Sequence, residues 1–139
     1  MKRFFLGVRS LNTDLAILLL RIVFGGLFIW HGWMMADNYS QYQPMTQDII
    51  GIGTKLTYDL PMIFELVCGT CIVLGFMTRL MVIPIAIIIT IAYFIAHKKD
   101  MFMMKTFPFL LMCLAPVVFI LGSGRYSLDN LIFSNKQQQ

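Results

Sequence analysis

Four long apolar blocks constrain this chain most strongly, because each is long enough to cross a lipid bilayer as a helix. A hydrocarbon core about 30 Å thick requires about 20 mainly apolar residues at a rise of about 1.5 Å each. Of the 139 residues, 58% are hydrophobic and only 13% are charged, which leaves too few polar residues to cover the surface of a soluble domain. The blocks span residues 15–36, 60–77, 80–97 and 107–121.

We therefore predict an all-α integral membrane protein, a four-helix bundle with antiparallel up-down topology, that forms a single transmembrane domain over residues 1–139. Asn12, Thr13 and Asp14 are suitable capping residues for the first helix, and Pro61 suits the first turn of the second. Pro116 should kink the fourth helix. The segment 37–59 between the first two helices is a candidate outer loop that contains a short interfacial helix.

The distribution of lysine and arginine predicts the orientation of the helices. Four spans place both termini on one side, and six flanking cations on that side face four on the other, which favours cytoplasmic termini. The N-terminal apolar run is too short for a signal peptide, so we expect no cleaved leader and insertion driven by the first spanning helix, which in a bacterium would place the chain in the inner (cytoplasmic) membrane. The six are Lys2, Arg3, Arg9, Arg79, Arg125 and Lys136, and the four are Lys55, Lys98, Lys99 and Lys105.

Several classes of function are disfavoured by the composition. The net charge of +4 is modest, and the cations lie at block ends without interleaved aromatic residues, so nucleic acid is not an expected partner. Cys68 and Cys71 have the CxxC spacing of thiol oxidoreductases, but small residues at a helix contact explain this segment more simply. Cys113 is a third thiol in an apolar segment, and the eleven methionines show no repeating ligand spacing. We predict no metal site.

Two ionisable residues, Arg21 and Glu65, fall deep within predicted spans, where each costs about 2.5–3.5 kcal/mol to insert unless it has a partner or a purpose. Helix arithmetic places Arg21 about 6 Å to the cytoplasmic side of the midplane and Glu65 about 6 Å to the outer side. A direct ion pair between them, or a structural pair that fixes helix register, remains an open alternative at this stage.

The outer halves of the helices carry the most suggestive group of polar residues. His31, Glu65, Tyr93 and His97 lie at comparable heights, and Tyr93 and His97 share one helical face with Thr90. A pocket formed by these side chains would hydrogen-bond a quinone carbonyl, relay protons or hold a metal. The alternative is that His97 only ends its helix at the interface and that His31 belongs to an aromatic belt with Trp30 and Trp33.

Three motifs resemble those of the DoxX family. They are Leu-Leu-Arg-Ile-Val-Phe-Gly-Gly-Leu-Phe-Ile-Trp-His-Gly at 19–32, Glu65 and Gly69 followed by Leu-Gly-Phe-Met-Thr-Arg at 74–79, and Gly-Ser-Gly-Arg-Tyr-Ser-Leu-Asp at 122–129. The resemblance implies a small four-helix membrane protein related to the DoxX-like subunit of thiosulfate:quinone oxidoreductase and to membrane partners of redox enzymes. The positions that match the family pattern are Arg21, His31, Glu65, Arg79, Arg125 and Asp129.

Together these observations yield a leading hypothesis and a rival. The leading hypothesis is a membrane subunit of a redox system in which His31 and Glu65 line a pocket for a quinone or similar molecule. In this hypothesis Arg21, Arg79, Arg125 and Asp129 form a structural polar core, and Arg125 and Asp129 pair locally. The rival is a non-catalytic assembly partner, in a larger complex or a homo-oligomer; a small transporter is a third option.

Overall fold

The computed structural model describes residues 12–49 and 51–133, and within these residues every regular element is helical. This confirms the all-α class and the four apolar helices expected from the sequence. The long helices are α2 (Thr13–Asp37), α4 (Thr54–Leu74), α5 (Thr78–Ile91) with its π-helical continuation η2 (Ala92–Ala96), and α6 (Phe102–Leu121). Each is long and apolar enough to cross a membrane. The short elements are α3 (Tyr39–Tyr42), η1 (Gln43–Met45) and α7 (Leu128–Phe133).

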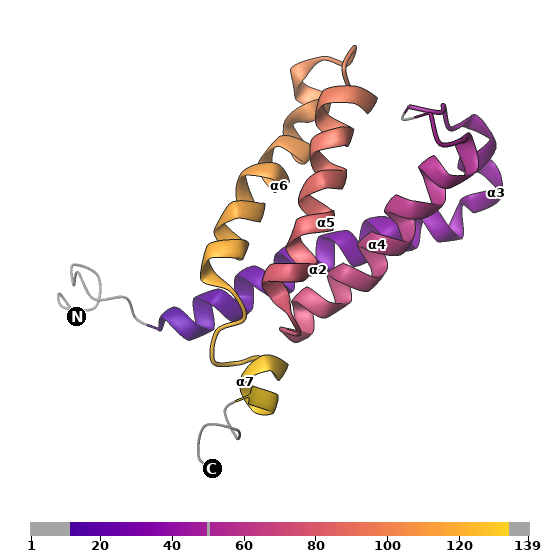
Figure 1. The fold of residues 1–139 in the computed structure, drawn as a ribbon. Helices are drawn as coiled ribbons and strands as arrows, with labels where there is room; N and C mark the ends of the chain where they lie inside the picture. Colours follow the sequence, from indigo (N-terminus) through magenta and orange to yellow (C-terminus); the bar gives the residue numbers. More distant parts are fainter. Residues whose placement is uncertain (1–11, 50, 134–139) are drawn as a thin grey trace.

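The long helices form two pairs, in which α2 lies along α4 and α5 lies along α6 (Figure 1). The pairs approach each other where α4 passes into α5 and separate toward the end that carries α3 (Figure 1). Side chains from all four helices fill the core at their junction. These residues are Phe24, Phe28, Cys68, Ile72, Val82, Ile85, Ile89, Leu111, Ala115 and Val118.

Glycines bring the backbones of α2 and α4 into direct contact. A Cβ added to Gly25 would lie 2.6 Å from the carbonyl oxygen of Gly69, and one added to Gly69 would lie 2.9 Å from that of Gly25. Further along the interface, a Cβ on Gly32 would lie 2.9 Å from Cγ of Leu66. Small residues of this kind permit close helix packing in a membrane, where the hydrophobic effect supplies little attraction between helices.

Local backbone chemistry explains why some helix ends differ from the sequence-based expectation. Asn12 caps α2 as expected, its side chain accepting a hydrogen bond from the Leu15 N–H at 3.1 Å. However, α4 begins at Thr54, six residues early, because the left-handed glycines Gly51 and Gly53 complete the preceding turn. Pro61 is therefore the eighth residue of α4, not a first-turn residue.

The other end of α4 is also set by a glycine. Gly75 adopts a left-handed conformation with φ of 73° and ends the helix at Leu74, three residues before the expected end. The fourth helix begins at Phe102, five residues early. The loop between α2 and α4 contains the short helices α3 and η1, as expected of an interfacial segment. The expectation of no cleaved leader falls on residues 1–11, outside the described residues.

The glycine contact yields a matched pair of variants. Gly25→Ala should lower the free energy of unfolding by about 1–3 kcal/mol, because its methyl group would overlap the α4 backbone. Gly26→Ala has no atom within 4 Å of the added methyl group and should leave stability unchanged or slightly raised. Unfolding by SDS in mixed micelles, followed by circular dichroism, measures both; equal effects would contradict the close-contact interpretation.

Candidate functional site

An acid–histidine pair joins α2 to α4 within the candidate spans. Nδ1 of His31 lies 2.6 Å from Oε2 of Glu65, whose side chain is only 6% exposed. The His31 side chain is 55% exposed. An acidic side chain is costly inside a membrane unless it has a partner, and His31 supplies that partner to Glu65. The pair is therefore a polar group that is buried on one side and accessible on the other.

The close packing of α2 on α4 explains why these two side chains meet. His31 lies six residues after Gly25, and Glu65 lies four residues before Gly69, the glycine that touches Gly25. Gly32, adjacent to His31, also allows α2 to approach Leu66 of α4. Both side chains consequently emerge at one level of the interface, and the site depends on the glycine register.

Three cavities adjoin the pair. The largest, of about 430 Å³, lies between α4 and α5 and is called here the α4–α5 cavity; both His31 and Glu65 border it. A central cavity of about 120 Å³ is bordered by both residues and by parts of α5 and α6. A third, of about 280 Å³, is bordered by His31, Met34, Met35, Tyr42 and Tyr58. His31 thus reaches all three cavities and Glu65 reaches two.

The α4–α5 cavity is mainly apolar, which makes the His31–Glu65 pair its distinctive feature. Residues such as Ile52, Leu56 and Ile87 form its walls. Thr46, Ile49 and Ile52, from the segment before α4, also border it, so this segment covers one side of the cavity. A lipophilic molecule with one polar end would match this combination of apolar walls and a single ionisable pair.

Tyr58 borders two of these cavities and was missed by the sequence analysis. Its hydroxyl donates a hydrogen bond to the Met35 carbonyl at 2.8 Å, and its ring makes an edge contact with Tyr39 at 5.5 Å between centroids. Tyr58 and Glu65 are seven residues apart and share a helical face. Had the early start of α4 been recognised from Gly51 and Gly53, this spacing would have identified Tyr58.

The structure separates the other two predicted pocket residues. His97 borders the central cavity with His31 and Glu65, but its Nδ1 contacts Oδ2 of Asp100 at 2.7 Å. Tyr93 borders none of the three cavities that adjoin the pair, and its ring packs against Phe94 and Phe109 instead. The cause lies in η2, where the His97 N–H bonds the Ala92 carbonyl five residues back, which breaks the α-helical spacing assumed for this face.

Arg21 does not pair with Glu65, so one of the open alternatives for these residues is excluded. Its side chain is 1% exposed, and its guanidinium donates to the carbonyls of Ser123, of Tyr126 at 2.8 Å and of Val73 at 3.2 Å. These carbonyls belong to the end of α4 and to the segment after α6. The negative ends of helix dipoles and free carbonyls therefore stabilise this cation.

The remaining polar-core residues lie at the same end of the molecule. Arg79 donates from Nε to the Phe119 carbonyl at 3.2 Å and from Nη2 to the Ile120 carbonyl at 3.3 Å. Asp129 accepts from the Met77 N–H at 3.0 Å and from the Ser123 hydroxyl. It thereby holds Met77 in its left-handed conformation, which non-glycine residues rarely adopt.

The local pair expected between Arg125 and Asp129 does not form. Arg125 lies 3.9 Å from Asp14 at the start of α2, and its side chain is 81% exposed. Asp129 instead accepts a hydrogen bond from the backbone N–H of Met77, in the turn between α4 and α5. Spacing of four residues favours a pair only within a helix, and α7 begins at Leu128.

Other chemistry considered from the sequence can be placed as follows. Within the described residues, no three or more His, Cys, Asp or Glu side chains gather into a group suited to a metal ion. Cys68, Cys71 and Cys113 are free thiols. Cys68 is buried, and Gly69, between the two motif cysteines, makes the backbone contact with α2. The packing interpretation accounts for this geometry.

The segment that covers the α4–α5 cavity is held by Asp48. Its Oδ1 accepts from the N–H groups of Gly51 at 2.8 Å and Ile52 at 3.1 Å, and its Oδ2 accepts from that of Gly53 at 2.9 Å. These hydrogen bonds lower the pKa of Asp48 from its ordinary value of 3.8, and the bond from Gly53 has the largest effect. The carboxylate form is therefore the one that organises the turn before α4.

This arrangement predicts how the turn responds to pH. Because the folded-state pKa of Asp48 is lowered, its stabilising effect is fully present above 3.8 and is lost as the pH falls through the lowered value. Asp48→Asn should therefore lower the protection factors of the amides of residues 51–53 against hydrogen exchange at neutral pH, to the values that the wild type has in acid. Asp14→Asn serves as a control; unchanged exchange in Asp48→Asn would contradict the assigned role.

Comparison with known proteins adds one positive finding. A family model described as DoxX matches residues 16–98, which is more than half of the chain and includes α2, α4 and α5. The match contains Arg21, His31, Glu65 and Arg79, and it ends before the motif at 122–129. No curated protein and no solved structure matches the chain. The resemblance inferred from the sequence motifs is thereby confirmed.

Proposed function

The chain belongs to the DoxX family and is a multi-pass membrane protein, and from this premise we propose that it is a membrane subunit of a redox system that binds a quinone or similar molecule. The ligand would occupy the α4–α5 cavity with a carbonyl oxygen at the His31–Glu65 pair. The observation that carries this proposal is the position of an acid–histidine pair, whose carboxylate is buried, in the wall of a mainly apolar cavity of about 430 Å³.

Proton placement in the pair explains how it would hold a carbonyl. When Glu65 is ionised and His31 carries protons on both nitrogens, Nδ1–H donates to Glu65 and Nε2–H is available to an acceptor. The described residues provide no other hydrogen-bond partner for the His31 ring. Glu65 would therefore act as a positioning residue that fixes the ring, and His31 would contact the ligand directly.

Replacing the carboxylate tests this assignment. Glu65→Gln should weaken binding of decylubiquinone to the purified protein by about tenfold or more, because it replaces the carboxyl group whose hydrogen bond orients the His31 ring. Isothermal titration in detergent measures the affinity, and circular dichroism verifies that the variant is folded.

Asp100→Asn is the matched control, because Asp100 also pairs with a histidine, at 2.7 Å, but is well exposed and borders none of the cavities described above. The Asp100→Asn variant should bind decylubiquinone with the affinity of the wild type. Equal affinities in the wild type and Glu65→Gln, or no binding by the wild type, would overturn the proposal.

A second candidate function is a non-catalytic partner within a larger complex or a homo-oligomer. Its basis is that exposed apolar side chains, including Phe94, Phe102 and Ile120, offer a surface to another helix as well as to lipid. Native mass spectrometry of the gently extracted protein distinguishes the two. A quinone-sized adduct lost in Glu65→Gln supports the redox pocket, whereas another polypeptide without a small ligand supports the partner role.

We also propose that the helices cross an inner (cytoplasmic) membrane in alternating directions, with both termini cytoplasmic. Contacts of Arg21 with Val73 and of His31 with Glu65 support opposite directions for α2 and α4. Arg79 and Arg125 lie at the end where α6 finishes, whereas Lys98, Lys99 and Lys105 lie in or near the loop before α6.

Reporter fusions test the orientation. Green fluorescent protein fused after residue 139 should fluoresce, and alkaline phosphatase at the same place should be inactive, because the C-terminus would remain in the cytoplasm. Phosphatase inserted after Lys99 should be active. The reverse pattern would show that the charge difference across the membrane does not determine the topology of this chain.

A further inference from the structure

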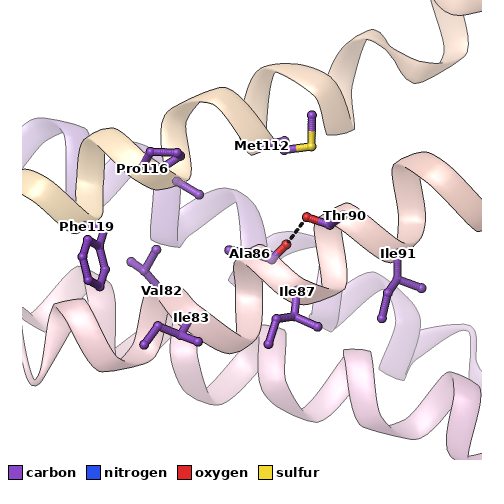
Figure 2. A pocket seen from close by; sticks show the side chains of 10 residues that line it. Val82, Ile83, Ala86, Ile87, Thr90, Ile91, Met112, Pro116 and Phe119 are labelled. Carbon is purple, nitrogen blue, oxygen red and sulfur yellow. Dashed lines mark hydrogen bonds between the residues drawn. The ribbon is translucent and has the colours of Figure 1, made fainter.

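The surface between α5 and α6 contains a groove that neither His31 nor Glu65 borders. It has a volume of about 480 Å³ and is bordered by Val82, Ile83 and Ala86 of α5 and by Met112, Pro116 and Phe119 of α6 (Figure 2). Thr90 is the one polar side chain among its lining residues. Its hydroxyl donates to the Ala86 carbonyl at 2.7 Å, so it presents no unsatisfied donor to an occupant (Figure 2).

The dimensions of the groove match a hydrocarbon chain. From Val82 to Ile91 its α5 wall is about 14 Å long, close to half the thickness of a hydrocarbon core of about 30 Å. A single extended acyl chain is the slender apolar occupant that a bilayer supplies over this length.

A cation stands at the end of the groove nearest the start of α5. Arg79 lies one turn before Val82 and Ile83, is exposed, and bonds the carbonyl of the lining residue Phe119. Two of its five N–H groups are used by the Phe119 and Ile120 carbonyls, and the described residues take no others. The free donors and the positive charge would therefore meet whatever lies at the membrane surface there.

We propose that the α5–α6 groove binds one acyl chain of an anionic phospholipid, whose phosphate group rests on Arg79. The chain fills the apolar groove across one leaflet, and the phosphate satisfies the remaining guanidinium donors. A basic residue at the surface end of a cleft between spanning helices is the arrangement that recognises anionic headgroups. This inference does not depend on the quinone proposal, because its polar group is Arg79 and neither His31 nor Glu65 borders the groove, although Ile87 and Ile91 border both the groove and the α4–α5 cavity.

Native mass spectrometry of the full chain tests it, with the protein taken from nanodiscs that contain equal amounts of phosphatidylglycerol and phosphatidylcholine. The wild type should retain phosphatidylglycerol over phosphatidylcholine by about fivefold, the ratio expected from about 1 kcal/mol for one surface cation. Arg79→Gln should abolish this preference and Arg79→Lys should retain it. Arg125→Gln, which changes an exposed arginine at the same end of the bundle, should leave it unchanged.

A second variant fills the groove itself. Ala86→Phe should remove one retained lipid of either headgroup while leaving Arg79 in place. Equal retention of the two lipids by the wild type, a preference that survives Arg79→Gln, or full lipid retention by folded Ala86→Phe would each overturn the proposal. A dimer without bound lipid that Ala86→Phe dissociates would also overturn it, because a second copy would then occupy the groove. If Ala86→Phe does not fold, the lipid preferences of Arg79→Gln and Arg79→Lys decide whether the proposal holds.

Discussion

The backbone contact between α2 and α4 is the constraint on which the rest of the structure depends. Gly25 and Gly69 touch, and this contact fixes the position of one helix along the other. From that register, Arg21 reaches the Val73 carbonyl at one end and His31 reaches Glu65 at the other. A larger side chain at either glycine would push α2 away from α4. The hydrogen bonds from Arg21 to Val73 and between His31 and Glu65 would then be too long to form, so the site would be lost together with the packing.

The two buried ionisable groups illustrate different solutions to the same problem. Glu65 is stabilised by the His31 side chain. An imidazole can gain or lose a proton, so it can exchange a proton with a ligand. Arg21 is stabilised by backbone carbonyls of Val73, Ser123 and Tyr126, which have fixed dipoles and no protons to exchange. Arg21 therefore holds the end of α4 and the segment after α6 together, whereas the His31–Glu65 pair lies where the helix pairs separate and cavities form. The chemistry of each group agrees with its location.

Features that depend on periodicity and length could be predicted from the sequence, and features that depend on backbone conformation could not. The four apolar helices and the nearness of His31 and Glu65 follow from hydrophobic length and from helix arithmetic. The partners of Arg21 are backbone carbonyls, two of them about a hundred residues away, which no side-chain pattern encodes. Likewise, the π-helical turn at η2 separates His97 from the helical face of Tyr93, because one extra residue in a turn rotates the residues that follow it. Asp48 and Tyr58 were missed because the turn at Gly51 and Gly53 starts α4 early.

The α2–α4 pair is more buried inside the protein than the α5–α6 pair, and the two pairs have different roles. Within the spanning windows, 28% of residues are buried in α2 and in α4, against 17% in α5 with η2 and in α6. The first pair carries the glycine contact and the acid–histidine pair, so its own packing builds the site. The second pair contributes one wall of the cavities and turns its other face outward, where Ile83, Phe119 and the groove between them remain uncovered. Because lipid tails are as apolar as these side chains, exposure of this face costs little inside a bilayer. Apolar contact alone does not distinguish one lipid from another in the α5–α6 groove. Selection of one lipid must therefore come from the charge of its headgroup, and Arg79 is the cation positioned to provide it.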